Sequence, residues 1–154
     1  MIVRKMHPAE FDDTLLLLDQ YFAEAAASLP EMRDQWDEES MITFVKTYAS
    51  QYQYCWLNAY VDNQPVGLIA GSITSAPWNE NVLTANIEMI FLEDLHRNMD
   101  NFTTLVEYFT NWAAAIGAKK ITAGDIGINP ARTKKIYEHL GYQPACFLVK
   151  DIEL

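Results

Sequence analysis

Three apolar runs follow one another between residues 54 and 92, and they constrain the fold more than any other part of the chain. From YCWLNAYV onward the apolar period is two, which is typical of β-strands. Asp62-Asn63-Gln64-Pro65 then supplies turn residues before VGLIAGSIT, so a β-hairpin is predicted. The third run, VLTANIEMIFL, is apolar enough for a central strand of a sheet.

Helical patterns precede and follow these runs. Pro8 suits the first position of a helix that is expected to run to about Ala27, and Asp37 is the expected N-cap of a second helix. A third helix has one apolar face between Phe102 and Ile116. The fourth is expected to start at the pair Asn129-Pro130 and to end before Gly141.

Three further segments resemble strands: MIVRKM at the start, KKITAG after the third helix, and ACFLVKDIEL from about residue 145. The expected order is strand, two helices, three strands, helix, strand, helix and strand. Such mixing predicts an α/β or α+β sheet fold. At 154 residues, of which half are apolar, the chain is expected to form a single domain over 1–154.

The charge balance bears on possible partners. Eleven Lys and Arg against 21 Asp and Glu give a formal charge of −10, which disfavours nucleic acid and anionic lipid and favours a cationic partner such as an amine. No apolar run reaches the roughly 18 residues that a membrane span needs. Cys55 and Cys146 lack metal-ligand spacing and the three histidines are scattered, so no metal site is expected, and a reducing cytoplasm is the simplest setting.

The order of elements, together with the segment NPARTKKIYEHLGY, resembles the GNAT superfamily of acyl-CoA N-acyltransferases over essentially the whole chain. In that family an Asn precedes a helix that ends in Tyr-Glu-x-Leu-Gly-Phe/Tyr. The strand IEMIFL leading into HRNMDNF is secondary support. The resemblance implies a GNAT-like, mostly antiparallel sheet of six to seven strands with four helices. This sheet would be splayed between ANIEMIFL and KKITAG, where acetyl-CoA would lie.

The resemblance also implies which residues contact acetyl-CoA. Backbone groups of the fourth strand would hold the pantetheine, and an Arg/Gln-x-x-Gly-x-Gly/Ala loop would hold the pyrophosphate. In this chain Arg97 takes the first loop position, Asp100 replaces the first glycine and puts a negative charge where a phosphate would lie, and Phe102 replaces the second. The expected cofactor residues are Phe91, Leu92, Arg97, Asn98, Met99, Asp100, Asn101, Phe102 and Asn129.

Two residues are candidates for proton transfer. Tyr137, at the family position, would be the acid that donates to the departing thiolate, although it can instead be a packed helix tyrosine. Glu88 lies where some family members, histone acetyltransferases among them, carry a basic glutamate. A carboxylate within NIEMIF would suit a base and attract an ammonium, but it can also be a solvated residue on the exposed face of the sheet.

The leading hypothesis is an N-acetyltransferase that moves acetyl from acetyl-CoA to a primary amine by direct transfer. Its rival is a catalytically weak or inactive GNAT-fold binding or assembly module, a hypothesis motivated by Asp100 and Phe102. A third hypothesis is a structural oligomer subunit whose apolar C-terminal strand pairs across an interface, so a homodimer is possible. The chemical identity of the amine is left open.

Overall fold

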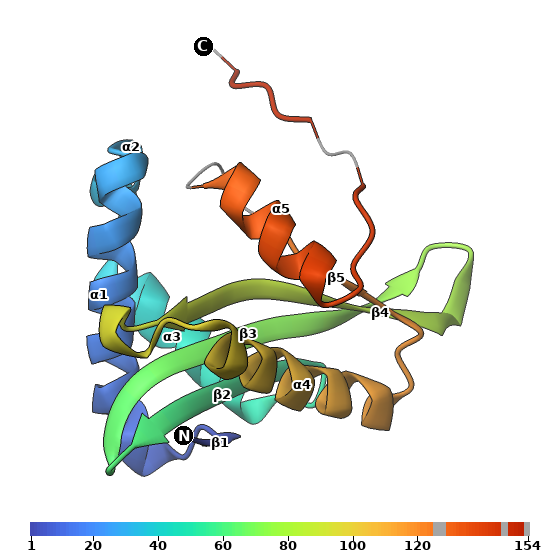
Figure 1. The fold of residues 1–154 in the computed structure, drawn as a ribbon. Coiled ribbons are helices and arrows are strands. Elements are labelled where there is room, and N and C mark those ends of the chain that lie inside the picture. Colours follow the sequence, from blue (N-terminus) through green and yellow to red (C-terminus); the bar gives the residue numbers. More distant parts are fainter. Residues whose placement is uncertain (125–128, 146–147, 153–154) are drawn as a thin grey trace.

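The computed structural model describes residues 1–124, 129–145 and 148–152. Within them, one sheet has the strand order β1-β2-β3-β4-β5 (Figure 1). The strands are β1 (Ile2–Lys5), β2 (Tyr54–Val61), β3 (Gln64–Ala76), β4 (Asn79–Leu92) and β5 (Lys120–Thr122). The α-helices are α1 (Phe11–Ser28), α2 (Glu31–Gln35), α3 (Glu38–Ser50), α4 (Met99–Ile116) and α5 (Pro130–His139). Short 3-10 turns span Pro8–Glu10 and Asp94–His96.

The sheet is mixed. The neighbours from β1 to β4 pair antiparallel, whereas β4 and β5 pair in parallel. The parallel pairing covers only Thr84–Asn86 of β4 and Lys120–Thr122 of β5. The expectation of six to seven mostly antiparallel strands is therefore corrected to a mixed five-stranded sheet in the described residues. The short β4–β5 pairing agrees with the splay expected between these two strands.

Local signals placed most of the helix ends correctly. The side chain of Asp37 caps α3 by accepting from the N–H of Ser40 at 2.8 Å. The side chain of Asn129 caps α5 by accepting from the N–H of Arg132 at 3.3 Å. Gly117 ends α4 in the left-handed region, with φ of 104°, as a C-terminal glycine should.

Two expectations about the elements were wrong. The four expected helices do not include α2 (Glu31–Gln35), so the described residues hold five α-helices rather than four. The C-terminal strand expected from about residue 145 is absent from residues 145 and 148–152, which lead away from the sheet (Figure 1), whereas 146–147 and 153–154 lie outside the described residues. A strand needs a partner edge, and β5 offers only three residues.

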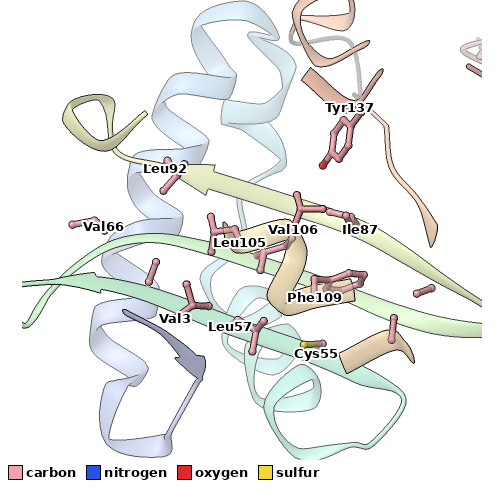
Figure 2. Close-up of a cluster of buried hydrophobic side chains, with 14 residues drawn as sticks. Val3, Cys55, Leu57, Val66, Ile87, Leu92, Leu105, Val106, Phe109 and Tyr137 are labelled. Carbon is pink, nitrogen blue, oxygen red and sulfur yellow. The ribbon is translucent and has the colours of Figure 1, made fainter. Parts of the chain in front are cut away.

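Two apolar layers cover the two faces of the sheet. The first packs α4 against the sheet through Leu105, Val106 and Phe109, and it includes Tyr137 of α5 (Figure 2). The second packs α1 and α3 against the opposite face and includes Leu17, Val45, Trp56 and Phe91. Within the described part of the chain, no helix combines the length and apolar character of a membrane span.

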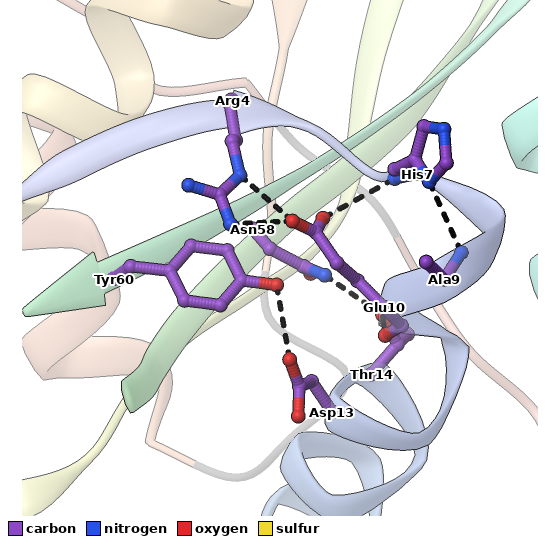
Figure 3. A network of polar contacts seen from close by, with 8 residues as sticks. All are labelled: Arg4, His7, Ala9, Glu10, Asp13, Thr14, Asn58 and Tyr60. Carbon is purple, nitrogen blue, oxygen red and sulfur yellow. Dashed lines mark hydrogen bonds and ion pairs between the residues drawn. The ribbon is translucent and has the colours of Figure 1, made fainter. Parts of the chain in front are cut away.

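A polar network fixes the start of α1 against β1 and β2 (Figure 3). Arg4 Nε donates to Glu10 Oε1 at 2.8 Å, and the Tyr60 hydroxyl donates to Asp13 at 3.4 Å. Deeper in the core, the Nδ2 of the fully buried Asn58 donates to Thr14 Oγ1 at 2.8 Å. These contacts orient α1, whose C-terminal half borders the site described next.

Candidate active site

A β-bulge interrupts β4 in the middle of the sheet. Ala70 of β3 pairs with Met89, but the next residue, Gly71, pairs with Ile87, so Glu88 is an extra residue on β4. Gly71 is required at this point because a Cβ would lie 2.0 Å from the carbonyl oxygen of Asn86. The bulge therefore depends on a close backbone approach that only glycine permits.

The bulge also redirects the side chains. Ile87 belongs to the apolar layer under α4, whereas Met89 belongs to the layer under α1 and α3. Glu88 lies on the α3 side with Met89, because its Oε2 accepts from the hydroxyl of Tyr48 on α3. Its Oε1 accepts from the hydroxyl of Ser72 on β3. Two hydrogen bonds thus hold an otherwise exposed carboxylate in one orientation.

Beyond Asn86, the edge of β4 that faces β5 has no strand partner among the described residues. The N–H of Glu93 donates to the carbonyl of Val66 at 2.8 Å. Because main-chain groups alternate in direction along an antiparallel ladder, those of Leu92 and Ile90 face the opposite, open edge. A ligand with amide groups could pair with this edge as a further strand would.

A cavity of about 440 Å³ lies along this open edge. Its walls come from α1, from β4, from the turn before α4, from the start of α4, and from α5. Nine of the eleven residues expected to form the site line it, namely Glu88, Phe91, Leu92, Arg97, Asn98, Met99, Phe102, Asn129 and Tyr137. Asp100 and Asn101 do not line it; Asp100 is an exposed residue in the first turn of α4.

Tyr137 enters the cavity from the α5 side. It is 6% exposed, and its ring extends from α5 toward β4 (Figure 2). Its ring packs edge-on against Phe102 and Tyr142 at 5.3 and 5.0 Å between centroids. Burial, with a smaller contribution from Tyr142, raises the pKa of the Tyr137 phenol, which therefore keeps its proton at neutral pH.

Glu88 and Tyr137 thus reach one cavity from opposite faces of the sheet. A carboxylate can accept a proton on one side of the open β4 edge, and a protonated phenol can donate one on the other side. This arrangement suits a reaction in which a nucleophile loses a proton and a leaving group gains one.

Arg97 reaches the cavity with its guanidinium already engaged. Its Nε and one terminal nitrogen donate to the carbonyl of Leu92 at 2.9 and 2.7 Å. The same terminal nitrogen is 2.8 Å from a carboxylate oxygen of Glu24 on α1, and the other is 3.3 Å from Asp94. This side chain therefore joins α1 to the end of β4.

Sequence reasoning missed several residues of the site. Arg132, Thr133 and Ile136 line the cavity from α5, and their spacing from Asn129 and Tyr137 follows one helical face, so that pattern could have found them. Tyr48 and Ser72 had no such signal, because they lie 40 and 16 residues from Glu88 in the chain. In the described residues no group of three or more His, Cys, Asp or Glu side chains could hold a metal ion.

Comparison with known proteins identifies one family. The model of the acetyltransferase (GNAT) family matches residues 18–142. No curated protein sequence matches the chain.

Several solved structures share the fold. The aminoglycoside N-acetyltransferase AAC(6′)-Iy in complex with CoA aligns with a TM-score of 0.75 and 13% identity over 99% of each chain. Ribosomal-protein-alanine N-acetyltransferase from Brucella melitensis biovar Abortus 2308 aligns with a TM-score of 0.72 and 16% identity over 100% of each chain. An aminoglycoside acetyltransferase from an uncultured soil metagenomic sample aligns with a TM-score of 0.72 and 20% identity, over 99% of this chain and 97% of that one.

Proposed function

The chain belongs to the acetyltransferase (GNAT) family, and we propose that it is an N-acetyltransferase that moves an acetyl group from acetyl-CoA directly to a primary amine. One observation carries this proposal: Glu88 and Tyr137 line the same cavity from opposite faces of the sheet, beside the open edge of β4. That geometry separates a proton acceptor from a proton donor across the place where an acetyl group would lie.

The unpaired main-chain groups along the open edge of β4 suit the amide groups of a CoA thioester. The main-chain groups of Ile90 on the open edge can pair with the amides of a pantetheine arm, while Arg97 occupies the carbonyl of Leu92 at the end of the strand. The cavity volume of about 440 Å³ lies within the roughly 300–1,000 Å³ range of small-molecule sites. Bound acetyl-CoA would supply the activated acetyl group and a thiolate leaving group.

Glu88 would remove the proton that an ammonium acceptor must lose before it can attack. Tyr48 and Ser72 each donate to one carboxylate oxygen, which leaves further lone pairs on both oxygens for the amine. Tyr137 would hold a proton at its hydroxyl oxygen for the leaving group, since burial raises its pKa.

The acceptor in this proposal is a cationic primary amine. Glu88 supplies a negative charge at the reacting position, and the formal charge of −10 on the chain attracts cations from a distance. Tyr21 and Ala25 of α1 line the cavity on the α1 side and would contact the body of the acceptor.

A second candidate function is a GNAT-fold binding or assembly module with little or no catalysis. Phe102 favours it, because this residue takes a position at which the family loop carries a small residue. The ring lines the cavity and packs against the catalytic candidate Tyr137. A bulky ring at this point would hinder the close approach of a phosphate to the backbone.

Calorimetry with CoA and acetyl-CoA, followed by thiol-release assays with a panel of primary amines, tests the two functions. The panel contains an alkyl monoamine, a diamine, an aminoglycoside and an alanine-initiated peptide. If the chain is the enzyme, CoA binds, and amines cause thiol release that Glu88→Gln slows by about 10²-fold or more. Binding without release from any amine would support the module, and no binding at millimolar CoA would rule out the acetyltransferase.

A further inference from the structure

Four charged side chains line the cavity among the described residues: Glu24, Glu88, Arg97 and Arg132. The formal charges of these four side chains sum to zero, although the whole chain carries a formal charge of −10. CoA carries several negative charges on its diphosphate and 3′-phosphate, and cations or N–H donors near these groups favour its binding. The two arginines are the candidates for this role.

Arg97 is committed to contacts within the protein. All three of its guanidinium nitrogens donate to protein acceptors, which are the Leu92 carbonyl and the carboxylates of Glu24 and Asp94. These contacts use most of its N–H donors, so two parallel hydrogen bonds to a phosphate would compete with Glu24, Asp94 or the Leu92 carbonyl. Two carboxylates also neutralise its charge, so Arg97 is less available to a phosphate than an unpaired arginine.

Unlike that of Arg97, the guanidinium of Arg132 is not held by acceptors among the described residues. Its backbone N–H is fixed by the Asn129 cap at 3.3 Å, so its Cα has a defined place in the first turn of α5. Its side chain is exposed and borders the cavity, and no ion pair or side-chain hydrogen bond engages its guanidinium among the described residues. Binding a phosphate would therefore break no hydrogen bond or ion pair between this side chain and the described part of the protein.

Arg132 lies nearer the N-terminal end of α5 than Tyr137, the proposed acid. Arg132 precedes Tyr137 by five residues, or about 7.5 Å along the helix axis. The N-terminal end of α5 lies on the side of α1, toward which β4 runs at its C-terminal end (Figure 1). The first turn of α5, which carries Arg132, therefore lies on the side of the molecule where β4 ends.

We propose that Arg132 binds the phosphate groups of CoA, as the cation that replaces the glycine-based phosphate loop missing from residues 97–102. This inference rests on the proposed function, because it assumes that CoA occupies the cavity. A planar guanidinium suits this role, since it can donate two parallel hydrogen bonds to one phosphate. The loss of close backbone contacts at Asp100 and Phe102 is offset by a side-chain contact from α5.

Calorimetry on the full chain tests the proposal with three probes: CoA, 3′-dephospho-CoA and pantetheine, which lacks all phosphates. Arg132→Ala is expected to weaken CoA binding about tenfold, because a charged hydrogen bond is lost, and to leave pantetheine binding unchanged. If Arg132→Ala also weakens the binding of 3′-dephospho-CoA, Arg132 contacts the diphosphate. If Arg132→Ala leaves the binding of 3′-dephospho-CoA unchanged, Arg132 contacts the 3′-phosphate; either outcome supports the proposal.

Lys135→Ala is the matched control, because it removes one positive charge from the same helix at a residue that does not line the cavity. It should bind CoA as the unmodified protein does. Arg132→Glu provides a second variant and should weaken CoA binding more than Arg132→Ala. Equal CoA affinity in Arg132→Ala and the unmodified protein, or an equal loss with pantetheine, would overturn this inference alone. A failure of the unmodified protein to bind CoA would overturn the proposed function as well.

Discussion

The hydroxyl of Tyr48 on α3 donates to Oε2 of Glu88 in the bulge of β4, across 40 residues of sequence. Burial and this hydrogen bond raise the pKa of Tyr48, so the phenol stays the donor and the carboxylate the acceptor. Tyr48 packs against Phe44 and Tyr54, each at 4.3 Å between ring centroids. Although α3 does not line the cavity, it therefore orients the carboxylate of Glu88 that does.

Tyr48→Phe removes this hydrogen bond while keeping the ring. If Glu88 is the base, turnover should fall about three- to tenfold, since one hydrogen bond is worth about 1 kcal/mol, with acetyl-CoA affinity unchanged. Steady-state kinetics and calorimetry give the two quantities. Tyr54→Phe is the matched control, and Tyr48→Phe should have no further effect on turnover in a Glu88→Gln background. An equal effect in both backgrounds would mean that Tyr48 acts only through packing.

Tyr137→Phe tests the proposed acid. We expect turnover to fall about 10²-fold or more, while the affinity for acetyl-CoA stays within about twofold, because the ring and its contacts with Phe102 and Tyr142 remain. Single-turnover kinetics at saturating acetyl-CoA measure this effect. Tyr52→Phe, at a tyrosine that is 81% exposed, controls for the loss of a hydroxyl. Full turnover by Tyr137→Phe would remove this residue from the mechanism.

Gly71→Ala should destabilise the protein strongly. The new Cβ would lie 2.0 Å from the Asn86 carbonyl oxygen and 2.7 Å from the Phe109 ring, so β4 and α4 must both move. We expect a loss of about 2–4 kcal/mol in the free energy of unfolding, measured by urea denaturation. Gly124→Ala is the control, because its Cβ would meet nothing within 4 Å. Equal stability of the two variants would contradict the tight crossing at the bulge.

Cys55 predicts an alkaline loss of stability. Burial raises the pKa of this thiol from 9.0 to about 12, and the thiol is 2% exposed. Between these pH values the unfolded chain loses a proton that the folded chain keeps, so this contribution to stability is complete below pH 9.0 and declines as the pH rises toward 12. The slope contributed by one such group is at most about 1.4 kcal/mol per pH unit.

Urea denaturation at a series of alkaline pH values measures this decline. Cys55→Ala should be less stable at neutral pH, because a buried sulfur is lost, but its stability should fall less steeply above pH 9.0. Comparing the two slopes separates the titration from the packing loss. Identical slopes would show that the thiol does not contribute to the alkaline transition.

Local sequence patterns predict most of the helices and strands, and the family resemblance predicts one side of the site. The period-two runs of β2 to β4, the apolar face of α4, and the caps at Asp37 and Asn129 depend on neighbours a few residues apart, so each local signal was readable. The place of Tyr137 on the cavity was expected from the resemblance of its helix motif to the GNAT family, and Tyr137 lines the cavity.

The other side of the site depends on contacts between residues far apart in the chain. The bulge at Glu88 depends on the register against Gly71, and the orientation of its carboxylate depends on Tyr48 and Ser72, which no local pattern connects to it. The engagement of Arg97 with Glu24, 73 residues away, likewise arises from the packing of α1 against β4. Long-range contacts of this kind depend on strand register and on helix packing, whereas sequence periodicity records only which face of each element is buried.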